Sequence, residues 1–289
     1  MFSIDLEDVR TMIPNGECYR PRVPAMTHLY LNFLRKHNAK CTFFIVGRTA
    51  LENRSLIGEI ISEGHEIACH THTHQPLTEM TPDTFRDDLR QNIQALTDCG
   101  AKSIKGFRAP TFSLVKTTAW AYDVMAQQGI EYSSSVLPAK NPLFGWEEFG
   151  TAPRQVENGK VGIARDDSGA GGASGVVEIP MTLLTSRFLT APFGGGVYFR
   201  ALPWPVMSRC FRRHNVRGSA VLSYFHPYDI DTEQERFMHP GIKNSRFYNW
   251  LMYRNRASVF TRLERVLAMG YKIDTYANFV QSRIVPLLN

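Results

Sequence analysis

Short apolar runs alternate with longer amphipathic stretches along most of the chain. Such runs are typical of buried strands, and apolar residues spaced three or four apart are typical of helices packed on a sheet. Strand–helix alternation of this kind predicts parallel βαβ units. The strands are expected at residues 1–5, 40–47, 65–69, 103–107, 176–180, 219–225 and 271–276, and the helices at residues 24–37, 51–63, 82–99, 116–128 and 257–270.

One of these helices has clear end signals. Thr81 can cap it, Pro82 suits its first position, and Gly100 fits its C-terminal stop. Its apolar stripe is expected to pack in the core, and consists of Phe85, Leu89, Ile93 and Leu96.

An irregular region at residues 137–175 interrupts the alternation. It ends in DDSGAGGASG, whose glycines and polar residues predict a loop. The chain has 289 residues and 43% apolar content, which suits an α/β barrel in a single domain. We therefore expect one domain over residues 1–289, with an insertion around 137–175.

Charge and cysteine content narrow the class of protein. The net charge is +6 and the sequence pI about 9.1, which suits an acidic glycan or the surface of a membrane. No standard nucleic-acid motif is present, so no nucleic-acid partner is expected. The five cysteines are scattered along the chain and their spacing shows no disulfide or metal-binding pattern. Neither a signal peptide nor an apolar run long enough to span a membrane is visible. These features predict a cytoplasmic protein.

Histidines are concentrated in EIACHTHTHQPL, where His70, His72 and His74 follow a predicted strand and His65 precedes them. The segment has two interpretations: a metal site or a polar surface strand. If the chain turns after the strand, His70 and His74 can chelate one divalent ion with a carboxylate, as in catalytic zinc sites. His72 would then point elsewhere, and His65 would only begin the strand.

Other polar residues also stand just past the ends of predicted strands. Asp5 ends the first strand in SIDLED, Arg108 follows another in GFRAPTF, and His226 follows a late one in LSYFHPYDID. In a β/α barrel the carboxyl ends of the strands meet on one face, where active sites lie. Together with His70, these residues occupy four such positions, and this predicts that they share one site. Arg108 is suited to hold a carboxylate by paired hydrogen bonds.

In order along the chain, SIDLED, TFFIVG, EIACHTHTH, FRAPTF and FHP resemble the motifs of the polysaccharide deacetylase family, the NodB homology domain of carbohydrate esterase family 4. YSSSVLP, YFHPYDID and SRFYNW are similar to the branch associated with exopolysaccharide export gene clusters. The resemblance runs from about residue 2 to residue 275. It implies a distorted (β/α)7–8 barrel with a divalent metal, usually zinc, at its mouth.

The resemblance also implies roles for the site residues. His70 and His74 correspond to the metal histidines and Asp5 to the general base. Arg108 corresponds to the arginine that orients the base, and His226 to the general acid. A backbone N–H near Thr111, in the loop stiffened by Pro110, would help to stabilise the tetrahedral oxyanion.

The chain departs from the family pattern at two positions. Leu6 stands where many members have a second aspartate, so the metal carboxylate is Glu7 or Asp8; strand alternation places Glu7 on the same side as Asp5. Ser133 stands where relatives often carry an aspartate that supports the catalytic histidine. Asp229 or Asp231 is the candidate replacement.

The implied reaction is metal-dependent hydrolysis of the N-acetyl group of an amino sugar in a polysaccharide or its precursor, with release of acetate. Aromatic residues in the second half are candidates for stacking on sugar rings, with core packing as the alternative: Trp146, Tyr198, Phe199 and Trp204. FGGGVYFR, residues 193–200, is a candidate substrate loop because glycine allows close backbone approach.

Two other functions compete with this one. The same fold can hydrolyse another C–N bond, as in allantoinase-like enzymes. The changes at Leu6 and Ser133 instead favour a non-catalytic relative that only binds glycans.

Overall fold

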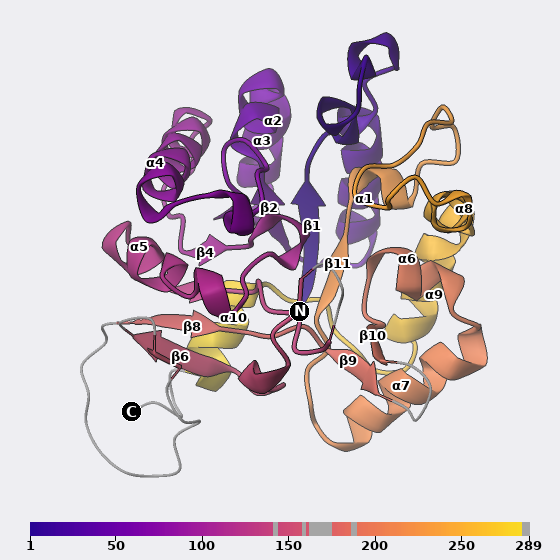
Figure 1. The fold of residues 1–289 in the computed structure, drawn as a ribbon. Coiled ribbons are helices and arrows are strands. Elements are labelled where there is room, and N and C mark those ends of the chain that lie inside the picture. The colour runs from indigo at the N-terminus through magenta and orange to yellow at the C-terminus, as the bar shows by residue number, and fades with distance from the viewer. Residues whose placement is uncertain (141–143, 158–159, 162–174, 186–189, 285–289) are drawn as a thin grey trace.

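The computed structural model describes residues 1–140, 144–157, 160–161, 175–185 and 190–284 of the 289. Its centre is a curled nine-stranded sheet in the order β11-β1-β2-β3-β4-β5-β8-β6-β7 (Figure 1). Neighbouring strands from β11 to β8 run parallel, and β6 and β7 extend the sheet antiparallel. The strands are β1 (Phe2–Leu6), β2 (Thr42–Ile45), β3 (Glu66–Cys69), β4 (Gly106–Phe107), β5 (Tyr132–Ser133), β6 (Arg154–Glu157), β7 (Lys160–Val161), β8 (Val176–Glu178) and β11 (Ser223–Phe225).

Helices cover the outer side of the parallel strands, and a separate hairpin precedes the helices of the second half (Figure 1). The hairpin pairs β9 (Leu183–Thr185) with β10 (Thr190–Pro192). The helices are α1 (Val23–Lys36), α2 (Gly47–Glu52), α3 (Arg54–Ser62), α4 (Pro82–Asp98), α5 (Ala121–Gln127), α6 (Gly196–Ala201), α7 (Trp204–Val216), α8 (Arg246–Tyr253), α9 (Val259–Leu267) and α10 (Tyr276–Phe279). The predicted α/β barrel-type fold is confirmed, as a curled sheet that no described strand closes between β11 and β7.

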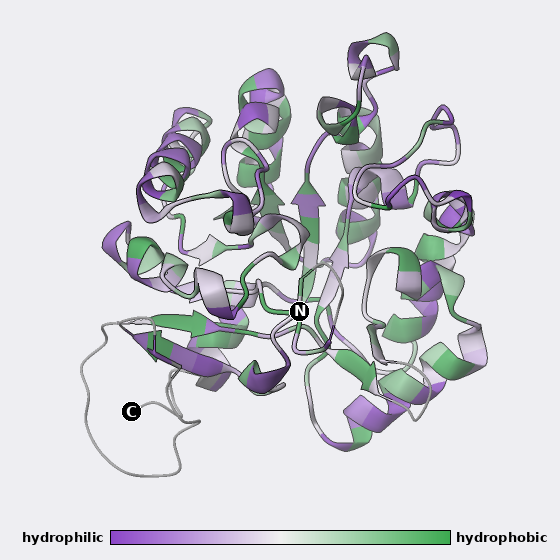
Figure 2. Cartoon of the chain, viewed as in Figure 1, coloured by the Kyte–Doolittle hydropathy of each residue, from purple (hydrophilic) through white to green (hydrophobic). Residues whose placement is uncertain are grey.

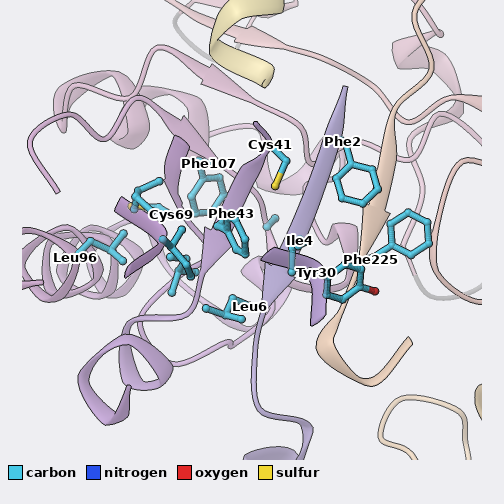
Figure 3. Packing of buried hydrophobic residues seen from close by; sticks show 14 of the residues in the cluster. Phe2, Ile4, Leu6, Tyr30, Cys41, Phe43, Cys69, Leu96, Phe107 and Phe225 are labelled. Carbon is cyan, nitrogen blue, oxygen red and sulfur yellow. The ribbon is translucent and has the colours of Figure 1, made fainter. Parts of the chain in front are cut away.

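The alternation of β1 explains how the core and the site share one strand. Phe2, Ile4 and Leu6 point to the helical side, where they join the main apolar cluster with Tyr30 and Phe225 (Figure 3). The residues between them face the inside of the curled sheet, because successive side chains of a strand point to opposite faces. Figure 2 shows the result: the central strands are mostly hydrophobic, while the tip of β1 is hydrophilic.

Most predicted elements form, with local differences. Thr81 caps α4 as expected, accepting a hydrogen bond from the backbone of Thr84. The helix expected at 51–63 is two helices that meet at Asn53, whose side chain donates to the carbonyl of Thr49. The one expected at 116–128 is a 3-10 turn, Lys116–Thr118, followed by α5.

The strand expected at 271–276 was wrong. Thr275 caps α10, and the segment before it is held to β1 by the hydrogen bond from the amide of Phe2 to the carbonyl of Asp274. The sequence pattern did not predict α7, α8 or the β9–β10 hairpin. Most of DDSGAGGASG and much of the proposed insertion at 137–175 lie outside the described residues. Across the described ranges, no helix has the length and apolar content needed to cross a membrane.

Candidate metal and catalytic site

Three residues from two segments, the end of the first strand and the loop after β3, converge beside the tip of β1. Ligand atoms of Glu7, His70 and His74 all lie within 4.8 Å of one another. Oε2 of Glu7 is 2.5 Å from Nε2 of His74 and 3.8 Å from Nε2 of His70. Two imidazoles and a carboxylate at this spacing are a typical donor set for zinc with open positions for water.

The loop that carries the histidines is fixed by α4. The carboxylate of Asp88 accepts hydrogen bonds from the amides of His72 and Thr73, and Asn92 accepts one from the amide of His70. Because Asp88 and Asn92 are one helical turn apart, one face of α4 holds the whole loop. His74 itself has a positive φ of 60°, an uncommon conformation for this residue type that the surrounding bonds maintain.

The tautomer of His70 and the surroundings of His74 suit metal binding. Nδ1 of His70 lies 2.8 Å from the carbonyl oxygen of Arg108, which can only accept, so Nδ1 is the donor and Nε2 presents a lone pair toward Glu7. In the described part of the chain, Nε2 of His74 is buried without a hydrogen bond of acceptable geometry. A buried polar nitrogen without such a partner is costly, and a cation held by His74 and Glu7 would remove that cost. The residues present therefore fit a divalent ion.

Glu7 is charged in this environment. Burial on its own would raise the pKa of the carboxyl, but the neighbouring His74 and His226 hold it well below its usual range. The other candidate ligand, Asp8, points away from the histidines. Its carboxylate pairs with Arg10 at 2.6 Å and caps the short turn Val9–Met12, so the structure does not bring Asp8 into the ligand group.

Asp5 is held by a fully buried arginine. Nη1 of Arg108 donates to Oδ1 of Asp5 at 2.6 Å and to the hydroxyl of Ser3. The remaining donors reach the carbonyl and hydroxyl of Ser134 and the hydroxyl of Tyr276. Burial would lower the pKa of Arg108, but the charge of Asp5 and the contacts with Tyr276 raise it above its ordinary value. The arginine therefore stays charged and fixes Asp5, leaving Oδ2 directed to the site.

His226 faces both carboxylates of the first strand region. Its Nε2 is 3.8 Å from Glu7 and 4.0 Å from Asp5, and its Nδ1 is 3.0 Å from Oδ2 of Asp229. Burial would lower the pKa of His226, but the negative charge of Glu7 and the hydrogen bond to Asp229 outweigh it and raise the pKa to about 9. The side chain is thus a protonated donor at neutral pH.

Asp229 also has a buried cationic partner. Nε and Nη2 of Arg200 lie 3.0 and 2.9 Å from its Oδ1. Burial would raise the pKa of Asp229, yet Arg200 and His226 hold it below its usual range. Of the two carboxylates considered as partners of His226, Asp229 makes the contact. Asp231 pairs with Arg22 at 2.8 Å instead.

Ser133 does not take part in this group. It is fully buried on β5, its hydroxyl lies 2.7 Å from that of Ser135, and it is in register with Glu178 of β8. Burial raises the pKa of Glu178, whose carboxylate accepts from the amides of Ser135 and Val136. The position therefore belongs to a buried polar layer next to the site.

Replacing Ser133 with aspartate is expected to destabilise the protein by about 2 kcal/mol or more, because a second buried carboxylate would lie beside Glu178. Activity should not rise, since Asp229 already supports His226. Urea unfolding and an acetate-release assay would measure both effects. A gain in turnover without loss of stability would show that position 133 supports the histidine, and Ser133→Asn is the matched neutral control.

The predicted substrate residues lie in different settings. Pro110 is buried, and Thr111 after it is exposed with a positive φ of 54°, beside Phe112 at 56°. Such strain in consecutive residues is typical of functional loops. Tyr198 is 39% exposed. Phe199, in contrast, is fully buried against Phe225 at 5.1 Å, so it serves the core rather than an accessible sugar site.

The remaining aromatic candidates pack in or beside the core, and the two other histidines lie outside the ligand group. Trp146 is buried against Phe149, and Trp204 packs at the edge of the core. His72 lies near the start of α2, where Gly47 leaves room for it. His65 accepts a hydrogen bond from the amide of Cys41 at the start of β3, away from the ligand group.

Several site residues were not predicted: Asp88, Asn92, Ser134, Arg200 and Tyr276. One signal was available for the first two. Asp88 directly precedes Leu89 and Asn92 directly precedes Ile93, and both of these apolar residues belong to the apolar stripe of α4. Asp88 and Asn92 are one helical turn apart, so both lie at the border of the buried face.

The chain is similar to known proteins in both sequence and fold. Residues 17–133 match the polysaccharide deacetylase family model, and residues 134–280 match a model described as a domain of unknown function, DUF3473. A chitooligosaccharide deacetylase from Sinorhizobium fredii is 34% identical over 88 residues, which cover 30% of this chain and 41% of that protein. A bifunctional xylanase/deacetylase from Pseudobutyrivibrio xylanivorans is 28% identical over 141 residues, or 48% of this chain and 21% of that protein.

The chain thus spans less than half the length of these curated relatives. A Mycobacterium smegmatis protein whose crystal structure is described as a polysaccharide deacetylase has a TM-score of 0.59 and 18% identity, covering 99% of this chain and 90% of that one. At that identity the likeness concerns the fold. The polysaccharide deacetylase match covers residues 17–133, which include the histidine loop and Arg108. Over residues 134–280, which include His226, this chain belongs to the family described as DUF3473.

Proposed function

We propose that this protein is a metal-dependent deacetylase that removes the N-acetyl group from an amino sugar of a polysaccharide or its precursor. The observation that carries the proposal is the grouping of Glu7, His70 and His74 beside two buried ion pairs, Asp5–Arg108 and His226–Asp229. The names of the curated relatives, which include deacetylases of chitooligosaccharides and of peptidoglycan N-acetylglucosamine, support the substrate class.

Glu7, His70 and His74 would hold the ion, and zinc suits this donor set. When bound, a divalent ion supplies a Lewis acid for the acetyl carbonyl and lowers the pKa of water. The protein adds one group that accepts a proton and one group that donates a proton. Asp5 accepts the proton of the attacking water through Oδ2, because Arg108 occupies Oδ1.

His226 supplies the proton for the leaving amine. Its Nδ1–H is engaged by Asp229, which leaves Nε2–H to face the site between Asp5 and Glu7. The exposed backbone at Thr111, whose strained conformation turns the loop after Arg108, is the proposed position for the oxyanion donor. The proposed acid His226 thus follows β11 and the proposed base Asp5 lies on β1, and these two strands are neighbours in the sheet.

The two features that favoured a non-catalytic relative have substitutes in the structure. Glu7 lies where a ligand is needed despite Leu6, and Asp229 contacts His226 despite Ser133. An allantoinase-like activity on another C–N bond has no specific observation in its favour. An amide-substrate screen that finds turnover of cyclic amides and none of N-acetyl sugars would establish it.

The finer assignments rest on motifs. YSSSVLP and YFHPYDID support a place in the branch associated with exopolysaccharide export clusters. A cytoplasmic location is supported by the free state of all five cysteines, three of which are buried.

Glu7→Gln is expected to lower metal affinity by at least about 100-fold and to abolish acetate release, since it removes a charged ligand. Metal content after dialysis and acetate released from N-acetylated oligosaccharides are the measurements. Asp8→Asn is the matched control, and it should keep both metal and activity because Asp8 pairs with Arg10.

The reverse result for the two variants would assign the ligand to Asp8. Full acetate release by Glu7→Gln, or by the wild-type protein after chelation, would reject the metal-dependent mechanism altogether.

A further inference from the structure

A short helix of the second half presents aromatic rings to solvent. On α8, Phe247, Tyr248 and Trp250 are 63%, 58% and 48% exposed. The rings of Phe247 and Trp250 stack with centroids 6.0 Å apart and an angle of 28°, and the guanidinium of Arg254 lies over Trp250 at 4.6 Å. Exposing three large rings on eight residues has a cost in water, which a ligand that covers them would remove.

The composition of this face limits what it can bind. The aliphatic side chains of α8, Leu251 and Met252, are half-buried toward the protein, so the exposed apolar surface is aromatic. No acidic residue occurs between positions 243 and 256. Flat rings with hydrogen-bonding edges, flanked by arginines, suit a ligand that is apolar on one face and polar at its rim.

The aromatic face continues toward the candidate catalytic site. Tyr198 of α6 is 39% exposed, and α6 packs against both α8 and β11. Tyr224 of β11 lies with its ring 6.0 Å from that of His226. Figure 1 shows α8 beside the loop that follows β11, at the level of the arrowhead of β1. Helix α6, which carries Tyr198, thus connects α8 with the strand that leads to His226.

A buried arginine connects α8 to the proposed general acid. Arg200 uses Nε and Nη2 for Asp229, the partner of His226. Its other contacts are the carbonyls at the end of α8, those of Leu251 at 3.0 Å, Met252 at 3.0 Å and Arg254 at 2.7 Å. A cation at the C-terminal end of a helix is favourable, and this one positions α8 and Asp229 together.

We propose that Phe247, Tyr248 and Trp250, together with Tyr198, form a binding surface for sugar units of a glycan chain that lie beyond the unit being deacetylated. This inference rests on the proposed function and makes the substrate an oligomer or polymer rather than a single sugar. Pyranose rings have an apolar face and a polar rim, as the surface requires. A membrane would also accept aromatic and basic residues, but it would not need the link through Arg200 to Asp229.

The test compares N-acetylglucosamine with its β-1,4-linked dimer and hexamer, using the wild-type protein and the triple variant F247A/Y248A/W250A. These side chains are exposed, so the variant should fold. We expect the wild type to bind and deacetylate the hexamer better than the monomer. The variant should lose about tenfold in hexamer affinity and in kcat/KM, with the monomer unchanged. L29A, which removes an exposed apolar side chain of α1, is the control and should keep the length dependence.

Binding followed by tryptophan fluorescence and by calorimetry separates this inference from the proposed function. Length-dependent binding that needs the three rings, without acetate release, would support the surface and reject the activity. Acetate release with equal hexamer and monomer efficiency, or no binding of any oligomer, would overturn the surface. Loss of sedimentation with anionic phospholipid vesicles in the variant, at unchanged hexamer affinity, would overturn it in favour of a membrane.

Discussion

Replacing Arg108 with methionine is expected to lower the free energy of unfolding by about 3–5 kcal/mol and to abolish acetate release. The side chain is fully buried, and its removal leaves Asp5 as a buried charge without its cation. The substitution also removes donors to Ser3, Ser134 and Tyr276. Urea unfolding gives the stability change, and turnover is measured on the fraction that remains folded at low temperature.

A matched surface pair provides the control. Arg86 pairs with Asp83 at 34% and 87% side-chain exposure, so Arg86→Met should cost about 1 kcal/mol or less and leave turnover unchanged. Similar losses of unfolding free energy for Arg108→Met and Arg86→Met would show that the buried contacts of Arg108 do not stabilise the site. Arg108→Lys keeps a charge but loses the paired geometry, and it should recover part of the stability without full activity.

Asp229→Asn is expected to reduce kcat by about 100-fold with a smaller change in KM. The carboxylate holds Nδ1 of His226 and contributes to its raised pKa. With the neutral amide, the pKa of His226 should fall. Because the general acid must be protonated, the alkaline limb of the kcat profile should then move to lower pH.

Asp231→Asn distinguishes this effect from a loss of packing. Asp231 is equally buried and also forms an ion pair, but with Arg22. Both variants should lose stability, since Asp229→Asn leaves the buried Arg200 without a carboxylate and Asp231→Asn leaves Arg22 with Glu233 alone. Only Asp229→Asn should shift the pH profile of kcat. An equal shift in both variants, or none in Asp229→Asn, would contradict the assignment of Asp229 as the positioning residue of His226.

The residues at strand ends could be predicted from the sequence because apolar runs have visible ends. Asp5, His70, Arg108 and His226 each follow such a run, and parallel strands bring their carboxyl ends to one side. The choice between Glu7 and Asp8 also followed the alternation of β1, which puts Glu7 on the same side as Asp5.

The supporting contacts could not be predicted because they depend on distant partners. Arg200 bonds to Asp229 and to carbonyls more than 50 residues away, and no local pattern marks such a residue. Asp229 and Asp231 look equivalent by alternation. The 3-10 turn Pro227–Asp229 brings Asp229 back to the amide and ring of His226. Phe199 failed as a sugar-stacking candidate because aromatic content alone does not separate core from surface.

The boundary between the two family matches falls between Ser133 and Ser134. Every proposed metal ligand and the proposed base precede that boundary, while the proposed acid, Arg200 and α8 follow it. In the proposed mechanism, the first half of the chain therefore supplies the metal ligands and the base, and the second half supplies the acid and the proposed glycan-binding surface. Exchange of the second half between relatives would then change the proposed glycan surface and the proposed acid together, while the proposed metal ligands and base stay the same.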